Sequence, residues 1–292
     1  MLDPKTLDAD LAAAEAAVPN LKQGAEKQII WAGKAGDVTD LAIVYVHGFS
    51  ATKHEIRPVP DTVAKTLGAN LYYARLAGHG CDGAAMGEPA WTDWLADTMQ
   101  ALDIGRAIGR QVIVVSCSTG CPLVTLALGK PDMTQQIVGN VLVSPNFGMA
   151  SKLLNLVLGL PLARRWLPAL AGRERGFEPI SEAHAKWWTT RYPSTAVFTM
   201  MDTVHAAWRQ DCSGLRIPTL VQACADDSVV SWSETQRFMK GWGGPVSTDL
   251  FVMGPGDDKN GHVIAGDIFS KGQTDAAVQS ILDWWQKFHI AG

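Results

Sequence analysis

The stretch Val114-Val-Ser-Cys-Ser-Thr-Gly-Cys121 decides the fold, because it joins an apolar run to a segment of helical length through small residues. The run before it, Gln111–Ser116, is rich in β-branched residues, and Gly120–Leu128 follows with the length and apolar content of a helix. Ser118 therefore stands on a predicted turn between a strand and a helix, with a small residue two positions to either side. Such a turn forces the serine into a strained backbone conformation and lifts its hydroxyl clear of the sheet. The pattern predicts a nucleophile, although Ser-x-Gly after a strand also serves as an ordinary helix cap.

Outward from this turn, short apolar runs alternate with segments of helical length along most of the chain. Runs that are apolar on both faces are typical of buried parallel strands. The repeated order of strand, helix and strand predicts an α/β domain with a central, mostly parallel sheet flanked by helices. The other predicted strands are 41–47, 71–76, 138–144, 219–224 and 248–253, and the other predicted helices are 56–68, 91–109, 232–242 and 274–289.

One interval, residues 147–212, breaks the alternation, since no strand-like run occurs in it. A gap of this length inside a compact domain indicates either disorder or an inserted subdomain. Its apolar residues, among them Leu153-Leu-Asn-Leu-Val-Leu158 and Trp187-Trp188, are too many for a linker. We therefore expect a helical cap over the active edge of the sheet. The expected parts are an N-terminal helical extension (1–27), an α/β core domain (28–146 and 213–292) and the cap (147–212).

Composition excludes several classes of protein. The chain has 292 residues, of which 47% are hydrophobic and 18% charged, and this balance excludes disordered and fibrous proteins. Because 25 Lys and Arg face 29 Asp and Glu, the net charge is −4 and no nucleic-acid partner is expected. Acidic residues near the start argue against a signal peptide, and no apolar stretch is long enough for membrane insertion. The odd number of five cysteines indicates reduced thiols, so a cytoplasmic protein is expected.

Two further residues supply the base and the acid that a serine nucleophile needs. Asp227 and His262 each follow a predicted strand, where the sites of open α/β sheets gather. Each residue alone has an ordinary explanation, since Asp226 and Asp227 also fit as loop acids and His262 is one of seven histidines. Three suitable residue types at three strand ends, in the order Ser118, Asp227, His262, favour a catalytic triad. Asp226 is the neighbouring alternative for the acid.

A fourth feature, Val46-His-Gly-Phe49, also follows a predicted strand. Ester hydrolysis turns the attacked carbonyl into an oxyanion, which two backbone N–H groups usually stabilise. One comes from the residue after the nucleophile, here Thr119, and the other from this loop, for which Phe49 is the candidate. We assign His47 and Gly48 to substrate binding beside them, although His-Gly is equally an ordinary turn after a strand.

Together these motifs resemble the α/β-hydrolases of the monoacylglycerol lipase and carboxylesterase type. The resemblance spans about residues 28–290 and is weakest in the cap. It implies a serine hydrolase with Ser118 as nucleophile, His262 as base and Asp227 as acid, and it favours Asp227 over Asp226 because Val-Val follows two residues later. The motifs are His47-Gly-Phe49 with Arg57-Pro58, Leu76-Ala-Gly-His-Gly80, Ser116-Cys-Ser-Thr-Gly120, Asp227-Ser-Val-Val230 and Gly261-His262.

The expected function is a serine carboxylic ester hydrolase that acts through an acyl-enzyme on esters with an apolar group, with water as the second substrate. No cofactor is expected, and no metal-ligand motif is present in the sequence. Trp187 and Trp188 are expected to contact the substrate under the cap, with packing of the cap on the core as the alternative. A catalytically silent scaffold for an apolar small molecule, a thioesterase, a perhydrolase and a carbon–carbon bond hydrolase stay open. The pattern fixes neither the acyl and alcohol parts of the ester nor an oligomeric state.

Overall fold

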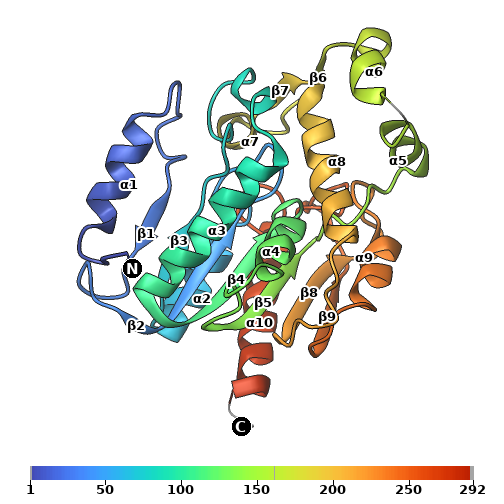
Figure 1. Cartoon of the computed structure of the whole chain (residues 1–292). Coiled ribbons are helices and arrows are strands. Elements are labelled where there is room, and N and C mark those ends of the chain that lie inside the picture. The colour runs from blue at the N-terminus through green and yellow to red at the C-terminus, as the bar shows by residue number, and fades with distance from the viewer. Residues whose placement is uncertain (1, 161, 290–292) are drawn as a thin grey trace.

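A seven-stranded sheet forms the centre of the computed structural model, which describes residues 2–160 and 162–289 (Figure 1). Its strands are β1 (Gln28–Ile30), β2 (Thr39–Val46), β3 (Asn70–Tyr73), β4 (Gly109–Cys117), β5 (Ile137–Val143), β8 (Thr219–Cys224) and β9 (Val246–Phe251). They lie in the order β1-β3-β2-β4-β5-β8-β9. β1 pairs with β3 in antiparallel orientation, and the other neighbours pair in parallel. The prediction of a central, mostly parallel sheet is confirmed.

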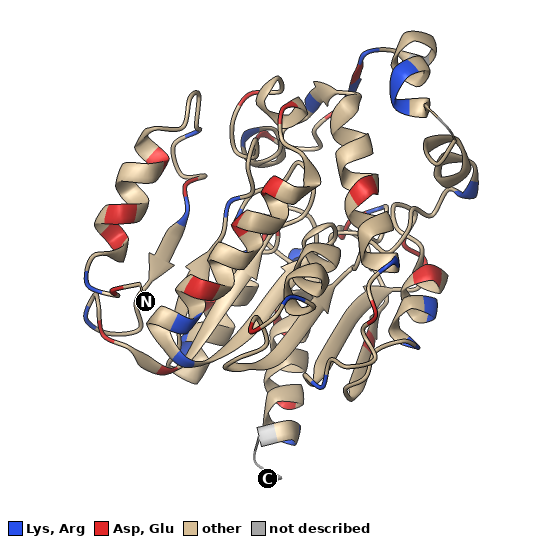
Figure 2. Cartoon of the chain, in the orientation of Figure 1, with Lys and Arg blue, Asp and Glu red and all other residues tan. Residues whose placement is uncertain are grey.

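The middle strands are buried on both faces, which explains their continuous apolar sequences. In β2, alternate residues point to opposite faces, so Val44 and Val46 enter one hydrophobic cluster while Ile43 and Tyr45 enter another. Figure 2 shows Lys and Arg residues interspersed with Asp and Glu residues over the helices and loops, whereas β5 and β8 carry none. The sheet therefore separates two apolar cores.

Helices cover both faces of the sheet (Figure 1). The helices α3 (Trp91–Ile108), α4 (Gly120–Leu128), α8 (Thr195–Trp208) and α9 (Trp232–Met239) contribute to one core, and α1 (Leu7–Ala16) also places leucines there. The helices α2 (Val59–Leu67) and α10 (Thr274–His289) cover the other core. Two short 3₁₀ helices complete the core region, η1 (Ala85–Gly87) and η2 (Lys271–Gln273). Among the described residues, none of the helices combines the length and the apolar character needed to cross a bilayer.

Some predicted boundaries are wrong by a few residues for local reasons. The predicted strand 71–76 ends at Tyr73, because Arg75 turns away to pair with a side chain of α1. The predicted helix 56–68 begins only at Val59, directly after Pro58, and ends at a left-handed glycine, Gly68. The predicted helix 232–242 ends at Met239.

The inserted segment, residues 147–212, gathers its first helices and a small sheet above one end of the central sheet (Figure 1). Its elements are α5 (Lys152–Leu158), α6 (Ala163–Ala171), β6 (Glu174–Gly176), α7 (Glu182–Trp187), β7 (Arg191–Pro193) and α8. The expectation that this segment contains no strand is wrong, since β6 and β7 pair in antiparallel orientation. Contacts that join the segment to the rest of the chain include the Thr189 N–H, which donates to the Ser50 carbonyl in the loop after β2 at 2.8 Å, and the Gln210 side-chain amide, which donates to the Thr125 carbonyl of α4 at 2.9 Å.

Candidate active site

Ser118 lies on the turn between β4 and α4, with a positive backbone φ of 50°. Its N–H donates to the Val143 carbonyl at 2.9 Å, which ties the turn to β5. A side chain cannot replace the hydrogen of Gly120, because a Cβ there would lie 2.5 Å from the Val46 carbonyl oxygen. The left-handed conformation and this close approach to β2 hold the Ser118 side chain at the carboxyl ends of the central strands.

A hydrogen-bonded series joins Ser118 to two other loops. His262 Nε2 lies 3.0 Å from Ser118 Oγ, and His262 Nδ1 lies 2.8 Å from Asp227 Oδ2. The other oxygen of Asp227, Oδ1, accepts from the backbone N–H groups of Val229 and Val230 at 2.7 and 2.9 Å. The carboxylate is thus anchored by one oxygen and orients the imidazole with the other, which leaves Nε2 to accept the serine proton. The neighbouring acid, Asp226, is exposed and has no part in this series.

The surroundings of His262 favour its charged form. Burial alone lowers the pKa of an imidazole, and this is the largest single influence at His262. The charge and hydrogen bond of Asp227, followed by the charges of Glu55 and Asp258, more than offset burial, so the pKa of His262 is raised above its usual value. An imidazolium formed by taking a proton from Ser118 is therefore stabilised where it forms.

Two backbone N–H groups beside Ser118 have no protein acceptor. Within the described part of the chain, the N–H groups of Phe49 and Thr119 donate no hydrogen bond to a protein atom. Thr119 is fully buried, and buried N–H groups without an acceptor are rare in proteins. Donors of this kind, fixed beside a nucleophile, suit the stabilisation of a developing oxyanion.

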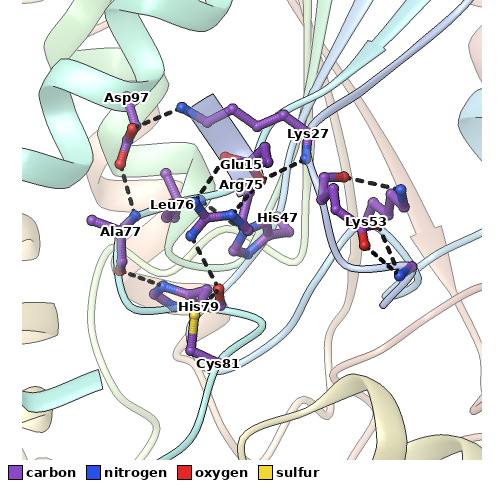
Figure 3. Close-up of polar contacts among 12 residues, drawn as sticks. Glu15, Lys27, His47, Lys53, Arg75, Leu76, Ala77, His79, Cys81 and Asp97 are labelled. Atoms are coloured by element: carbon purple, nitrogen blue, oxygen red, sulfur yellow. Dashed lines mark hydrogen bonds and ion pairs between the residues drawn. The ribbon is translucent and has the colours of Figure 1, made fainter. Parts of the chain in front are cut away.

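His47 holds the loop that carries Phe49. Its Nε2 accepts from the Leu76 N–H at 3.1 Å, so the ring proton is on Nδ1 and donates to the Gly48 carbonyl at 2.8 Å (Figure 3 shows the contact with Leu76). The carbonyl of Gly48 and the N–H of Phe49 belong to one planar trans peptide and point in opposite directions, so fixing the first aims the second. Burial lowers the pKa of His47 to about 4, which keeps this neutral form. Both ring nitrogens are engaged by the protein, so His47 supports the loop rather than contacting a substrate as expected.

Further buried polar contacts hold the loop after β3, as Figure 3 shows. Arg75 binds both carboxylate oxygens of Glu15 on α1, at 2.6 and 2.8 Å, and donates to the His79 carbonyl at 3.3 Å. The ring of His79 packs on His47 and against the edge of Phe49, with centroids 4.9 and 6.2 Å away. The N-terminal helix α1 is thereby connected to the loop beside Ser118.

Trp187 and Trp188 both pack against residues outside the inserted segment, as the alternative to substrate contact predicts. Trp187 stacks on His54 with ring centroids 3.6 Å apart, and its ring would lie 2.7 Å from a Cβ on Gly24. Trp188 is buried against Phe269 of the core, with centroids 5.3 Å apart. Besides His79, the aromatic rings that approach Phe49 are those of Trp94, on α3, and Tyr192, on β7.

Two buried carboxylates near Ser118 and His262 could not be singled out from the sequence. Asp258 accepts from the backbone N–H groups of Asn260, His262 and Val263 at 2.9 to 3.1 Å, and it shapes the loop that carries His262. Glu55 lies in the loop before α2 and contacts the segment that carries Phe49. An Asp in a glycine-rich loop is a weak indication of such a turn, whereas nothing in the local sequence distinguishes Glu55.

Cys117, the residue before Ser118, carries a buried thiol. Burial, followed by the nearby charge of Glu55, raises the pKa of its thiol well above the usual value, so the thiolate is disfavoured. All five cysteines are buried free thiols. In the described ranges, no group of three or more His, Cys, Asp or Glu side chains is arranged to hold a metal ion.

Comparisons with known proteins agree with the fold. The model of the alpha/beta hydrolase family matches residues 43–284. A structure from a study of LipS and LipT, two metagenome-derived lipolytic enzymes, has a TM-score of 0.72 at 18% identity, covering 91% of this chain and 99% of the other. The Paleococcus ferrophilus monoacylglycerol lipase scores 0.62 at 14% identity, covering 90% and 98%, and a soluble variant of monoglyceride lipase from Saccharomyces cerevisiae scores 0.65 at 11% identity, covering 90% and 91%. A search of curated proteins gave no significant match.

Proposed function

The chain belongs to the alpha/beta hydrolase family, and from that premise we propose that it is a serine hydrolase of carboxylic esters, of the carboxylesterase or monoacylglycerol lipase type. The observation that carries the proposal is the continuous series of hydrogen bonds from Ser118 through His262 to Asp227, at 3.0 and 2.8 Å. These distances are within the reach that proton transfer requires without any rearrangement. The lipolytic activities named for two of the similar folds agree with it.

In the proposed reaction, Ser118 Oγ attacks the acyl carbon while its proton passes to His262 Nε2. Asp227 keeps the proton on Nδ1 and stabilises the imidazolium. His262 then returns the transferred proton to the leaving alcohol, and an acyl-enzyme remains on Ser118. Water attacks this ester with the same base and releases the acid.

The N–H groups of Phe49 and Thr119 are proposed to bind the oxyanion in both halves of the reaction. They suit this role because both lie beside Ser118 without a protein acceptor. Removal of one such donor from a serine hydrolase typically costs about 10²- to 10³-fold in kcat. The proposed chemistry is complete with side chains, backbone and water, so we propose no cofactor.

We further propose that the ester carries an apolar group and that residues 147–212 form a cap over the site. Support comes from the leucines that this segment leaves exposed in α5 and α6, including Leu153 and Leu156 at 70% and 65% exposure. Apolar surface of this extent on one segment is typical of surfaces that meet an apolar ligand or partner.

Labelling with a fluorophosphonate, which reacts with activated serines, tests the proposal. The wild type should be labelled and should hydrolyse p-nitrophenyl esters, whereas Ser118→Ala should lose both properties. Ser116→Ala is the matched control, because Ser116 is buried at the end of β4, two residues before Ser118, and its hydroxyl donates to the Val141 carbonyl at 3.4 Å. Labelling that survives in Ser118→Ala would refute the assignment. Labelling of Ser118 without turnover across an acetate-to-laurate series would favour the binding scaffold.

A further inference from the structure

Glu55 is a buried glutamate that the proposed mechanism does not use. Its side chain is 3% exposed, in the loop that joins β2 to α2. One oxygen, Oε2, accepts from the Gly48 N–H at 2.7 Å and from the Tyr45 hydroxyl at 2.8 Å. The carboxylate therefore links Gly48, the residue before Phe49, to Tyr45 of β2 through one oxygen atom.

The other oxygen of Glu55 lies on the side of the nucleophile. A Cβ on Gly48 would lie 2.6 Å from Glu55 Oε1 and 2.9 Å from Ser118 Cβ. Glu55 Oε1 and Ser118 Cβ are therefore no farther apart than the sum of these two distances. The same imaginary atom would lie 3.3 Å from the Cys117 carbonyl oxygen. Gly48 is thus held between the Glu55 carboxylate and the turn that carries Ser118.

We propose that Glu55 is a positioning residue of this site: it fixes the Gly48 N–H, in the peptide directly before the one that carries the Phe49 N–H, and its negative charge faces His262. The inference rests on the ester hydrolysis proposed above. His47 holds the carbonyl of Gly48 and Glu55 holds its N–H, so both polar groups of that residue are fixed. With both groups fixed, the next N–H, that of Phe49, keeps its direction when the oxyanion forms.

The charge has its own consequence for the base. Three acids from three loops face His262: Asp227 after β8, Asp258 in its own loop, and Glu55 after β2. The groups that face Glu55 in turn are Tyr45, Cys117, His262 and the Gly48 N–H. Burial raises the pKa of Glu55, while these contacts oppose the rise. Because the carboxylate is shielded from water, its ionised form acts strongly on the imidazolium that appears during catalysis.

Two substitutions separate the two roles. Glu55→Ala removes both the acceptor and the charge, so kcat per labelled active site should fall about 10- to 100-fold with KM changed less than about threefold, somewhat below the loss of a whole oxyanion donor. Glu55→Gln keeps a carbonyl oxygen for the Gly48 N–H and the Tyr45 hydroxyl but removes the charge. Its kcat should stay within about tenfold of the wild type, because the donor remains aimed.

The charge is measured in the resting protein, without turnover. NMR titration of the His262 ring, assigned by its absence in His262→Gln, should move to lower pH in Glu55→Gln, because a negative charge that favours the imidazolium has gone. The matched control is Glu15→Gln, which also converts a buried glutamate but one that binds Arg75; it should lower Tm and leave the His262 titration unmoved.

Each half of the proposal has an outcome that overturns it. Wild-type kcat per labelled site in Glu55→Ala would refute positioning, and a His262 titration in Glu55→Gln that coincides with the wild type would refute the charge. If Glu55→Ala does not fold, Glu55→Gln is compared with Tyr45→Phe, which removes the Tyr45 hydroxyl but keeps the bond between Glu55 and the Gly48 N–H. An equal loss of kcat in these two variants would mean that each acts only through packing, and it would refute positioning. A wild type that is never labelled would refute the ester hydrolysis itself, while the His262 titration still tests the charge.

Discussion

Gly48→Ala is the substitution that most directly tests how the site is held. The backbone of Gly48 is not in the left-handed region, so alanine meets a steric obstacle there and no conformational penalty. Its Cβ would lie 2.6 Å from Glu55 Oε1 and 2.9 Å from Ser118 Cβ, which is 0.8 and 0.5 Å short of the 3.4 Å at which ordinary contact begins. Ser118 is fixed by β5 and Glu55 is buried, so the peptide of Gly48 and Phe49 must move.

A shift of this size displaces the Phe49 N–H from the position that the oxyanion needs. A misplacement of about 1 Å can cost about 100-fold, and a lost oxyanion donor about 10²- to 10³-fold, so we expect kcat to fall about 100-fold, or about 2.7 kcal/mol. KM for a p-nitrophenyl ester should change little, since the donor acts mainly on the transition state. The assay is kcat per active site, counted by phosphonate labelling. Gly214→Ala is the control, because a Cβ there meets nothing within 4 Å. A kcat for Gly48→Ala within threefold of that control would refute this account of the loop.

Three further predictions follow from the contacts of the site and the core. The kcat/KM should rise with pH through the ionisation of His262, which must lose its proton to act as base, and the midpoint should lie above 6.5 because the pKa of His262 is raised. Asp227→Asn should lower that midpoint and reduce kcat about 10³- to 10⁴-fold, and an unchanged midpoint would refute the charge argument. Trp188→Ala should lower the free energy of unfolding by about 3 to 5 kcal/mol, and Trp187→Ala should lower it less because Trp187 is only half-buried. If either variant changes the preference for acyl length as well as lowering Tm, the residue contacts the substrate. Glu15→Gln should lower the free energy of unfolding by about 3 kcal/mol, because Arg75 is left buried without its charged partner. Since the pKa of Glu15 is lowered in the fold, the stabilisation by this ion pair should be present above pH 4.5 and fade as pH falls further, and equal Tm values for variant and wild type at pH 7 would contradict it.

The sheet was predictable because its strands are local patterns. The runs that form β2, β4, β5 and β8 are apolar on both faces, and parallel strands inside a sheet need that burial. The carboxyl ends of parallel strands meet at one edge, so residues after three predicted strands were expected near one another. Ser118, Asp227 and His262 do lie within hydrogen-bond distance of one another along the series.

The short strands were not predictable in the same way. β1, β6 and β7 have three residues each, and a run of that length carries no periodicity. β1 exists because it pairs with β3, whose partner residues are 41 to 45 positions further along the chain, and β6 exists because it pairs with β7. Such strands depend on distant partners, which a single sequence does not identify.

The roles of the acids could not be separated by sequence because the loops of the site need acceptors. Where a loop leaves a strand, its N–H groups lose their partners in the sheet, and side-chain carboxylates can replace them. Asp227, Asp258 and Glu55 all do so, each in a different loop. Both carboxylate oxygens of Asp258 accept hydrogen bonds from backbone N–H groups, whereas only one oxygen of Asp227 does so and the other contacts His262. An acid in such a loop therefore indicates chemistry only when an oxygen remains for another side chain, as it does at Asp227. At Glu55 both backbone and side-chain partners bind Oε2, and Oε1 faces the turn that carries Cys117 and Ser118.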